Sequence, residues 1–151
     1  LMTLQSLINT GMLAAYASLP EQLVIWDCHQ GNTAVNGHEV AGFLDCDLMC
    51  VAPRMFDVAC MLVHMIKWNI GDAVAEQDWL AHAVHVVRGY VSVSPLSPHE
   101  RHALFYVMAG VPLIFMDWFA KTGNTGATAT EMRLFRWLVQ SRDEIVRRFG
   151  A

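Results

Sequence analysis

The sequence predicts a mainly α-helical domain with a small β-hairpin region in its first third. Apolar residues recur at helical spacing in several segments after Pro53, which is typical of packed helices. Asn36-Gly37 separates two short β-like runs, as in a hairpin. A chain of 151 residues fits one such domain and is long enough to bury a core. We therefore expect residues 1–151 to form a single domain.

The first segments combine a helix with a short apolar run. Apolar residues recur at helical spacing between Leu4 and Met12, which predicts a helix over residues 2–18. The residue before a proline disfavours the helical conformation, so Leu19-Pro20 should end this helix. The run Leu23–Trp26 is β-like, but a run this short fits either a strand or a helix.

The hairpin is a strong local signal. The runs Thr33–Val35 and Glu39–Leu44 flank the pair Asn36-Gly37. Asn-Gly supplies the two positive φ angles of a type I′ turn. We expect these two residues to be the centre of the turn.

Helical spacing takes over after Pro53. The first helix there has one apolar face, formed by Phe56, Ala59, Cys60, Val63 and Ile66. A loop over residues 69–72 should follow it, and then a second helix from about residue 78 to residue 90.

Capping boxes mark the starts of two further helices. Ser97–Glu100 has the form of a capping box with proline at the first helical position. The long apolar helix after it should kink near Pro112 and end near Gly123. Thr128 with Glu131 has the same form and predicts a last helix that runs to about residue 148.

The composition excludes several classes of protein. Apolar residues make up 54% and charged residues 16%, against a usual charged share of about 25%, which excludes a disordered tail. A net charge of −4 offers no basic stripe for nucleic acid. The longest uncharged apolar stretch, Ala103–Met116, contains a proline and is shorter than the roughly 20 residues of a membrane span. We expect neither a nucleic-acid nor a membrane partner.

The cysteines indicate a reducing compartment. Cys28, Cys46, Cys50 and Cys60 lie close together and are too few for a secreted disulfide framework. We expect reduced thiols and a cytoplasmic location. Because the chain begins with Leu1 rather than Met, we expect it to be a piece of a longer protein.

Three polar residues have the spacing of a phosphoryl-transfer site. Asp27 and Asn32 share a loop after an apolar run, and Asp45 follows at the end of the hairpin. Kinase-type transfer needs a carboxylate that orients the attacking hydroxyl and takes its proton. It also needs an Asn and a second Asp to hold Mg²⁺ against the nucleotide phosphates. The hairpin would return Asp45 to the neighbourhood of Asn32.

The sequence around these residues resembles the aminoglycoside phosphotransferase and choline kinase-like family. Asp27–Asn32 reads Asp-Cys-His-Gln-Gly-Asn and is similar to the family's catalytic loop, His-Gly-Asp-x-His-x-Gly-Asn. Phe43–Asp47 is similar to its metal-binding motif, and Pro53–Ala59 and Leu96–Trp118 are similar to the segments that follow. The resemblance implies the C-terminal lobe of a protein-kinase-like fold. It also implies ATP and Mg²⁺ as cofactors and a small-molecule hydroxyl as the acceptor.

The resemblance implies a role for each matching residue. Asp27 would be the catalytic base, and His29 would support its loop. Asn32 and Asp45 would bind Mg²⁺ and, through it, ATP. Asp47 would lie near the metal or the substrate.

Two departures from the family pattern bear on activity. Ile25 and Trp26 replace the leading His-Gly of the motif, and the Trp26 ring is large enough to crowd the loop. The chain also lacks the glycine-rich loop and the Lys of an N-terminal lobe, and Gly123–Gly126 has no P-loop Lys to replace them. We therefore expect the isolated chain to be inactive. Asp57 should cap the next helix and brace the lobe.

Other clusters have simpler interpretations. His82 with His85, and His99 with His102, are each three apart and could share a helix face. No further ligand at zinc spacing completes either pair, so we do not expect zinc. The aromatic and methionine residues of 105–119 are expected to be core.

Three functions stay open at this point: a phosphotransferase, a degenerate kinase-like module that binds without catalysis, and a structural helical interaction domain. The acceptor is open too, because an aminoglycoside would need clustered carboxylates. The candidates Asp72, Glu76, Asp78 and Asp117 lie on separate segments. The low charge predicts an apolar surface that binds an N-terminal lobe or self-associates.

Overall fold

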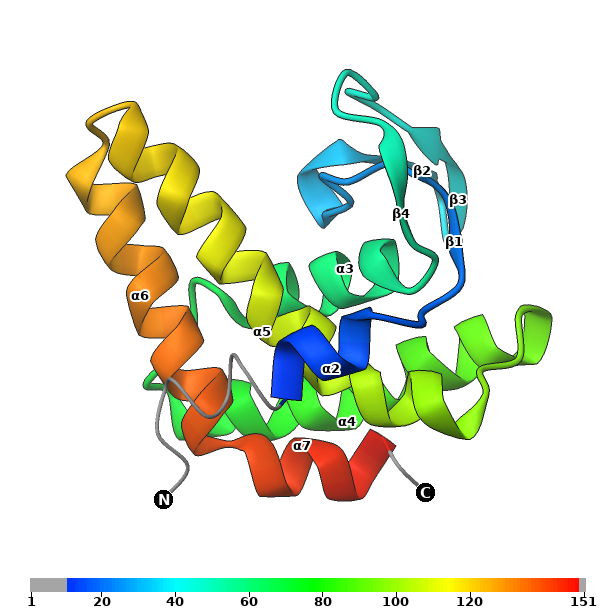
Figure 1. Ribbon diagram of the computed structural model, residues 1–151. Helices are drawn as coiled ribbons and strands as arrows, with labels where there is room; N and C mark the ends of the chain where they lie inside the picture. Colours follow the sequence, from blue (N-terminus) through cyan, green and yellow to red (C-terminus); the bar gives the residue numbers. More distant parts are fainter. Residues whose placement is uncertain (1–10, 150–151) are drawn as a thin grey trace.

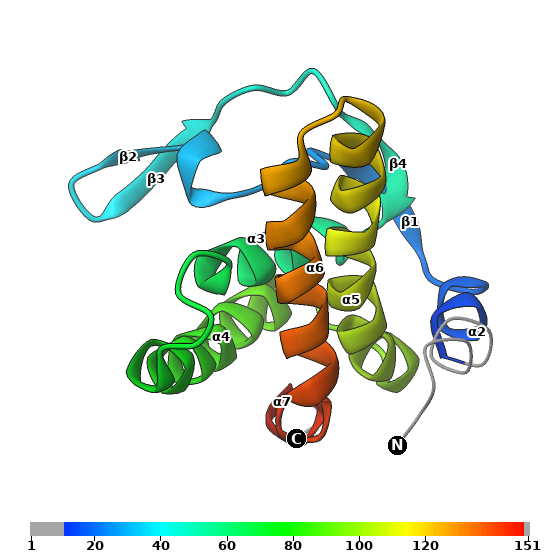
Figure 2. The same cartoon turned by 90° about the vertical axis from the view of Figure 1, so that its left-hand side faces the viewer.

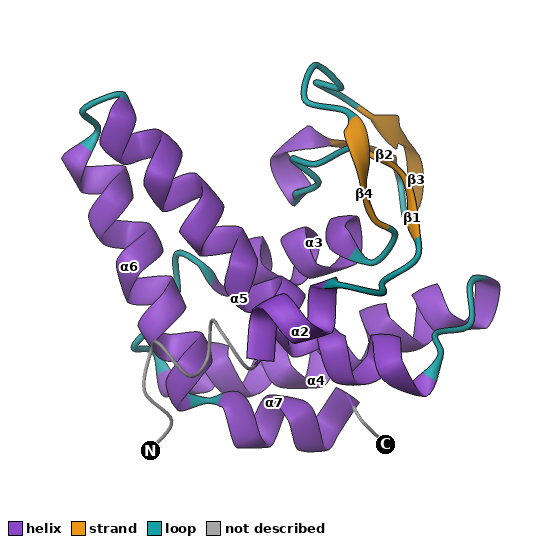
Figure 3. Ribbon diagram, viewed as in Figure 1, coloured by secondary structure: helices purple, strands orange, loops and turns teal. Residues whose placement is uncertain are grey.

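Helices form most of the chain, and two short strand pairs lie on one side of them (Figure 1 and Figure 3). The computed structural model describes residues 11–149. In chain order the elements are α2 (Leu13–Tyr16), β1 (Glu21–Val24), η2 (Gln30–Asn32), β2 (Thr33–Asn36), β3 (Glu39–Phe43), β4 (Cys50–Pro53), α3 (Phe56–Ile66), α4 (Ala73–Val93), α5 (Pro98–Lys121), α6 (Thr125–Gln140) and α7 (Arg142–Phe149). The prediction of a mainly helical fold with a small β region is confirmed.

The first predicted helix is described only in its C-terminal part. α2 ends before Pro20, as predicted, while residues 2–10 lie outside the described part of the chain. α2 packs closely on α5, because a Cβ atom at Gly110 would lie only 2.9 Å from Oη of Tyr16. Glycine at this position permits the close approach.

Two antiparallel strand pairs make up the β region. β1 pairs with β4, with Glu21 opposite Pro53 and Val24 opposite Cys50. β2 and β3 form the predicted hairpin, which projects away from the helices in Figure 2. The apolar run at Leu23 is therefore a strand, and β4 is a strand that the sequence did not indicate.

The hairpin turn differs from the prediction. Asn36 pairs with Glu39, so the two central residues are Gly37 and His38. Gly37 has a φ of 62°, and neither Asn36 nor His38 has a positive φ. Glycine with positive φ at the first central position is the pattern of a type II′ turn. Because this turn needs only one such residue, Asn36 can remain in the strand.

α3 buries the predicted apolar face, but α4 begins earlier than expected. Its N-cap is Asp72, whose Oδ1 accepts hydrogen bonds from the main-chain N–H groups of Val74 and Ala75. The prediction started the helix near residue 78, five residues too late, and the structure shows residues 73–77 to be mostly exposed. The capping carboxylate was the available signal.

α5 begins with the predicted capping box. Oγ of Ser97 accepts from the N–H of Glu100, and the carboxylate of Glu100 accepts from the N–H of Ser97. Pro112 lies inside the helix, and Figure 1 shows α5 changing direction in its central part. Length and composition alone would allow α5 to cross a membrane. However, 61% of its most apolar window is buried inside this protein, as in a core helix.

The predicted last helix is two helices with a different start. α6 is capped by Asn124, whose Oδ1 accepts from the N–H of Ala127, and α7 is separated from α6 at Ser141. Thr128 lies inside α6, and Glu131 is buried against Lys67. The Thr-x-x-Glu pattern therefore did not mark a cap, because its glutamate faces the interior.

The core lies where α5 packs against α2, α3 and α6. Its largest fully buried apolar side chains are Phe56, Met55, Leu62, Ile66, Leu104, Met108, Leu134, Leu138 and Ile145. Arg54 fixes the end of β4 to this core. Its guanidinium donates to the Glu100 carboxylate at 2.6 and 2.9 Å and to the carbonyl oxygen of Pro95 at 2.7 Å. The β1–β4 pair is thereby anchored to the start of α5.

Candidate active site

Asp27 lies in the loop after β1, and Asp57 fastens that loop to α3. The two carboxylate oxygens of Asp57 accept from the main-chain N–H groups of Ile25 and Trp26, each at 3.0 Å. Asp57 is the second residue of α3, and the N-cap residue, Met55, makes no capping side-chain bond. The predicted N-cap role of Asp57 was therefore wrong. Because its bonds reach the main chain, they do not depend on which side chains precede Asp27.

Trp26 occupies the position where the family motif has glycine. Its φ is 75°, in the left-handed region that glycine adopts without steric cost. The indole ring stacks on Phe56, with 4.2 Å between ring centroids and 9° between ring planes. The ring thus packs on α3, and the expected crowding of the loop is not observed.

Asn32 holds the side chain of Asp27 in place. Its Nδ2 donates to the main-chain oxygen of Asp27 at 3.0 Å and to Oδ2 of Asp27 at 3.3 Å. With Nδ2 engaged in this way, Oδ1 of Asn32 is the atom left to bind a cation. Oδ1 of Asp27 accepts no hydrogen bond from the described residues, so it is the oxygen available to a substrate.

His29 shapes the turn between these two residues. Its Nδ1 accepts from the N–H of Gly31 at 3.0 Å, and its Nε2 lies 3.6 Å from Oδ2 of Asp27. Its carbonyl oxygen accepts from Oγ1 of Thr33 at 3.0 Å. These contacts tie the loop to the short helix η2.

The structure brings Asp45 toward Asn32 through the main chain. The N–H of Leu44, next to Asp45, donates to the carbonyl oxygen of Asn32 at 2.8 Å. Asp45 has a φ of 53°, and both Asp45 and Asp47 are exposed. Neither carboxylate makes a hydrogen bond or ion pair with another residue of the described range 11–149. Carboxylate and amide oxygens of this kind are ligands that suit Mg²⁺.

α3 contributes a second group of residues behind Asp27. One ring nitrogen of His64, Sγ of Cys60 and a carboxylate oxygen of Asp27 lie within 4.8 Å of one another. Nδ1 of His64 lies 2.9 Å from the carbonyl oxygen of Cys60, its hydrogen-bond acceptor. Burial raises the pKa of the Cys60 thiol far above its usual range and lowers that of His64 to about 4. At neutral pH this pair is therefore an uncharged thiol and a neutral imidazole.

The sequence did not predict these α3 residues as parts of the site. The available signal was their spacing, since Cys60, His64 and Lys67 recur every three or four residues on the helix after the Asp57 position. Among residues 11–149, the Asp27, Cys60 and His64 group is the one set of three or more metal-binding side chains that lie together. Neither His82–His85 nor His99–His102 forms such a set.

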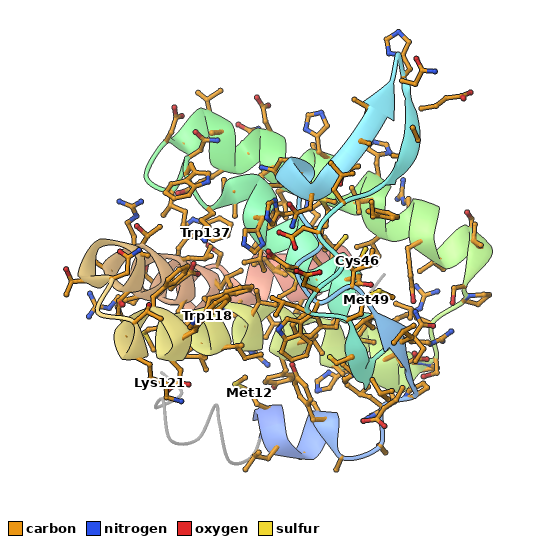
Figure 4. The ribbon with its side chains drawn as sticks, turned by 90° about the horizontal axis from the view of Figure 1, so that it is seen from above. Met12, Cys46, Met49, Trp118, Lys121 and Trp137 are labelled. Atoms are coloured by element: carbon orange, nitrogen blue, oxygen red, sulfur yellow. The ribbon has the colours of Figure 1, made fainter. Side chains whose placement is uncertain are left out.

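A pocket of about 480 Å³ opens beside Asp27. It is lined by Asp27, His29, Gln30, Gly31, His64, Lys67, Trp68, Phe115, Trp118 and Phe119. Figure 4 shows Trp118 on α5, to the left of Cys46 and Met49 of the β3–β4 segment. The aromatic run of α5 was predicted to be core. That holds for Phe105, Met108 and Phe115, but Trp118 is half exposed and forms part of the pocket wall.

A helical domain with a paired Asp and Asn on a loop, two exposed carboxylates after the following hairpin and an open pocket has the parts of a phosphotransferase. Comparison with protein families agrees with this class. The model of the phosphotransferase enzyme family matches residues 8–96, more than half of the chain, and the chain belongs to this family. Membership implies a protein-kinase-like fold. Neither the curated proteins nor the solved structures contain a match to this chain.

Proposed function

We propose that this chain is the C-terminal lobe of an ATP-dependent phosphotransferase that transfers a phosphoryl group to a hydroxyl of a small molecule. The observation that carries the proposal is the pairing of Asn32 with Asp27 at the mouth of an open pocket. Family membership supports the reaction class. Asp27 is the base in this proposal, with His29 as a support of its loop.

Asp27 and Asn32 divide the chemistry between them. Oδ2 of Asp27 is held by the Asn32 amide, which leaves Oδ1 to accept the proton of the attacking hydroxyl. Asn32 Oδ1 and the carboxylate of Asp45 would hold Mg²⁺, with Asp47 exposed beside them. When bound, Mg²⁺ supplies charge neutralisation at the ATP phosphates. The fixed positions of the protein groups contribute the alignment on which this reaction depends.

The β region has an exposed apolar surface on which a second lobe could pack. Large apolar side chains are exposed there: Leu23, Val35, Val40, Phe43, Leu44, Leu48, Met49 and Val51. We propose that an N-terminal, nucleotide-covering lobe packs on this face, and that the chain without it is inactive. A cytoplasmic location, without nucleic-acid or membrane partners, completes the proposal.

Thermal unfolding with and without Mg²⁺-ATP tests the metal–nucleotide half of the site. A ligand that binds only the folded chain stabilises it by about 2.7 kcal/mol at 100 times its Kd. We expect the midpoint to rise in the wild-type chain and in Asp143→Asn, an exposed control on α7, but not in Asp45→Asn. An equal rise in Asp45→Asn would contradict the metal assignment.

Turnover in a protein that carries both lobes tests the base. Asp27→Asn keeps a hydrogen-bonding side chain but cannot take a proton at neutral pH. General-base catalysis contributes about 10²–10⁴-fold, so we expect a loss of that size in kcat. Unchanged turnover in Asp27→Asn would show that Asp27 is not the base.

A further inference from the structure

The pocket beside Asp27 has aromatic walls from two separate helical segments. Trp68 follows α3, and Phe115, Trp118 and Phe119 belong to α5. Its volume of about 480 Å³ lies in the range of small-molecule sites, roughly 300–1,000 Å³. Because Asp27 lines the same pocket, a molecule bound there lies next to the proposed base.

The tryptophans of the pocket leave large apolar faces open. Trp68 is 69% exposed and Trp118 is 48% exposed, although both sit beside a deep core. Trp118 lies nearly parallel to Phe119, with 4° between their planes and 6.1 Å between their centroids. A flat guest that stacks on such rings would remove the exposed apolar surface from water, at about 25 cal/mol per Å².

The charges of the pocket do not suit a polycation. Asp27 is the single carboxylate among the lining residues. Of the candidate carboxylates for an aminoglycoside, Glu76 lines other pockets, and Asp117 pairs with Lys121 at 2.6 Å. The imidazole of His64 is neutral at physiological pH because burial lowers its pKa to about 4.

A single quaternary ammonium group is also disfavoured. The ammonium of Lys67 already lies over one face of the rings of Trp68, Phe115 and Phe119, at 5.4, 5.9 and 6.0 Å from their centroids. The same ammonium pairs with the buried carboxylate of Glu131 at 2.5 Å. A second cation brought to these rings would meet the like charge of the Lys67 ammonium.

We propose that this pocket binds the acceptor, and that the acceptor is an uncharged compound with a flat apolar ring system whose hydroxyl reaches Asp27. The ring system stacks on Trp68 and Trp118, and the hydroxyl donates to Oδ1 of Asp27. This proposal rests on the proposed function, and it names the acceptor class of the same site.

Binding of three probes to the chain tests the proposal without ATP. Calorimetric titration compares naphthylethanol, an uncharged ring alcohol, with choline and kanamycin. We expect naphthylethanol to bind most tightly, and Trp68→Ala and Trp118→Ala each to weaken it about tenfold. Trp137→Phe, which alters a tryptophan outside this pocket, should leave the affinity unchanged. Trp68 is largely exposed and Trp118 is half exposed, so these variants should fold, and circular dichroism verifies this.

The outcomes separate the acceptor class from the reaction. Tighter binding of choline or kanamycin that is lost in Trp68→Ala would overturn the acceptor class. The acceptor class would also be wrong if naphthylethanol did not bind, or if its binding ignored both substitutions. The Mg²⁺-ATP shift and its loss in Asp45→Asn are measured without any acceptor. A failed phosphotransferase proposal would therefore appear there and leave the ring-binding result intact.

Discussion

Trp26 combines an unfavourable backbone conformation with a favourable ring contact. A left-handed φ at a non-glycine residue costs about 1–2 kcal/mol. The stacking of its ring on Phe56 offsets part of this cost. The loop can therefore keep its shape with tryptophan in place of the motif's glycine. The hydrogen bonds to Asp57 come from main-chain N–H groups, so they form with either residue at position 26.

This balance predicts an unusual order of stability. Trp26→Ala loses the ring and keeps the backbone cost, whereas Trp26→Gly loses both. We expect the glycine variant to be more stable than the alanine variant by about 1 kcal/mol in urea unfolding. At Val93, an exposed helical position, alanine should be the more stable of the two. An alanine variant as stable as the glycine variant at position 26 would show that the backbone there is not strained.

His64 and Glu100 predict how stability depends on pH. Burial lowers the pKa of His64 from 6.5 to about 4, so the unfolded chain takes up this proton first as the pH falls. Stability is complete above pH 6.5 and is lost as the pH falls toward 4, by roughly 3 kcal/mol in the limit. The hydrogen bonds from Arg54 lower the pKa of Glu100 from 4.5 to about 2, so its contribution is lost at lower pH, between 4.5 and 2.

Urea unfolding across this range separates the two groups. We expect His64→Gln to remove the decline between pH 6.5 and 4 and to keep the decline below 4.5. His85→Gln, at an exposed position on α4, should behave as the wild type. If the slope above pH 4.5 were the same in His64→Gln, His64 would not be the group that titrates.

At the residue scale, local motifs could predict part of the site. Asp27 and Asn32 stand in one loop, so their spacing was enough to pair them. His64 and Lys67 come from a helix more than thirty residues later, and their approach depends on how α3 is rotated against the loop. A local sequence pattern cannot predict how α3 is rotated.

At the scale of elements, the helix starts show how a cap is chosen. Ser97 and Thr128 each precede a glutamate by three residues, but only Ser97 forms the capping box. Asn124 caps α6 instead, and Glu131 faces Lys67 in the interior. A capping pattern therefore identifies a helix start only when its glutamate bonds back to the N-cap residue and is not drawn into the interior.

Alanine substitutions distinguish the two candidate caps of α6. Loss of a capping side chain costs about 1 kcal/mol. We expect Asn124→Ala to lower the free energy of unfolding by that amount and to fray the first turn of α6 in amide exchange. Thr128→Ala, inside the helix, should change stability by less than half as much. Equal losses at both positions would contradict the assignment of the cap.

The two strand pairs differ in how well the sequence could predict them. β2 and β3 are joined by a two-residue turn, so the hairpin could be predicted from adjacent residues. β1 and β4 are separated by the whole catalytic loop and hairpin, and their pairing is held by the Arg54 contacts at the far end of β4. The β4 strand was missed because its partner is distant in the sequence.

At the scale of the whole molecule, the low charged fraction is reflected in exposed apolar side chains on the two strand pairs. In the β1–β4 pair, Leu23 stands opposite Val51, and these side chains are 61% and 68% exposed. In the hairpin, Val35 stands opposite Val40, and these are 67% and 61% exposed. Within residues 11–149 each sheet has two strands, so both strands of each pair also present an edge that no described strand pairs with. Apolar faces joined to open edges favour association with another chain.

This surface predicts that the chain without a covering lobe self-associates. Analytical ultracentrifugation at increasing concentration should show a mass above that of the monomer. Leu23→Lys combined with Val51→Lys should restore the monomer, because two charges on neighbouring strands resist burial and repel a second copy. Val93→Lys, at an even more exposed site on α4, should not change the association. If the wild-type chain sediments as a monomer at high concentration, these apolar pairs do not form an interface between copies. If the control substitution alone disrupts association, the contact lies on the helices, and the lobe-binding role of the strand face loses its support.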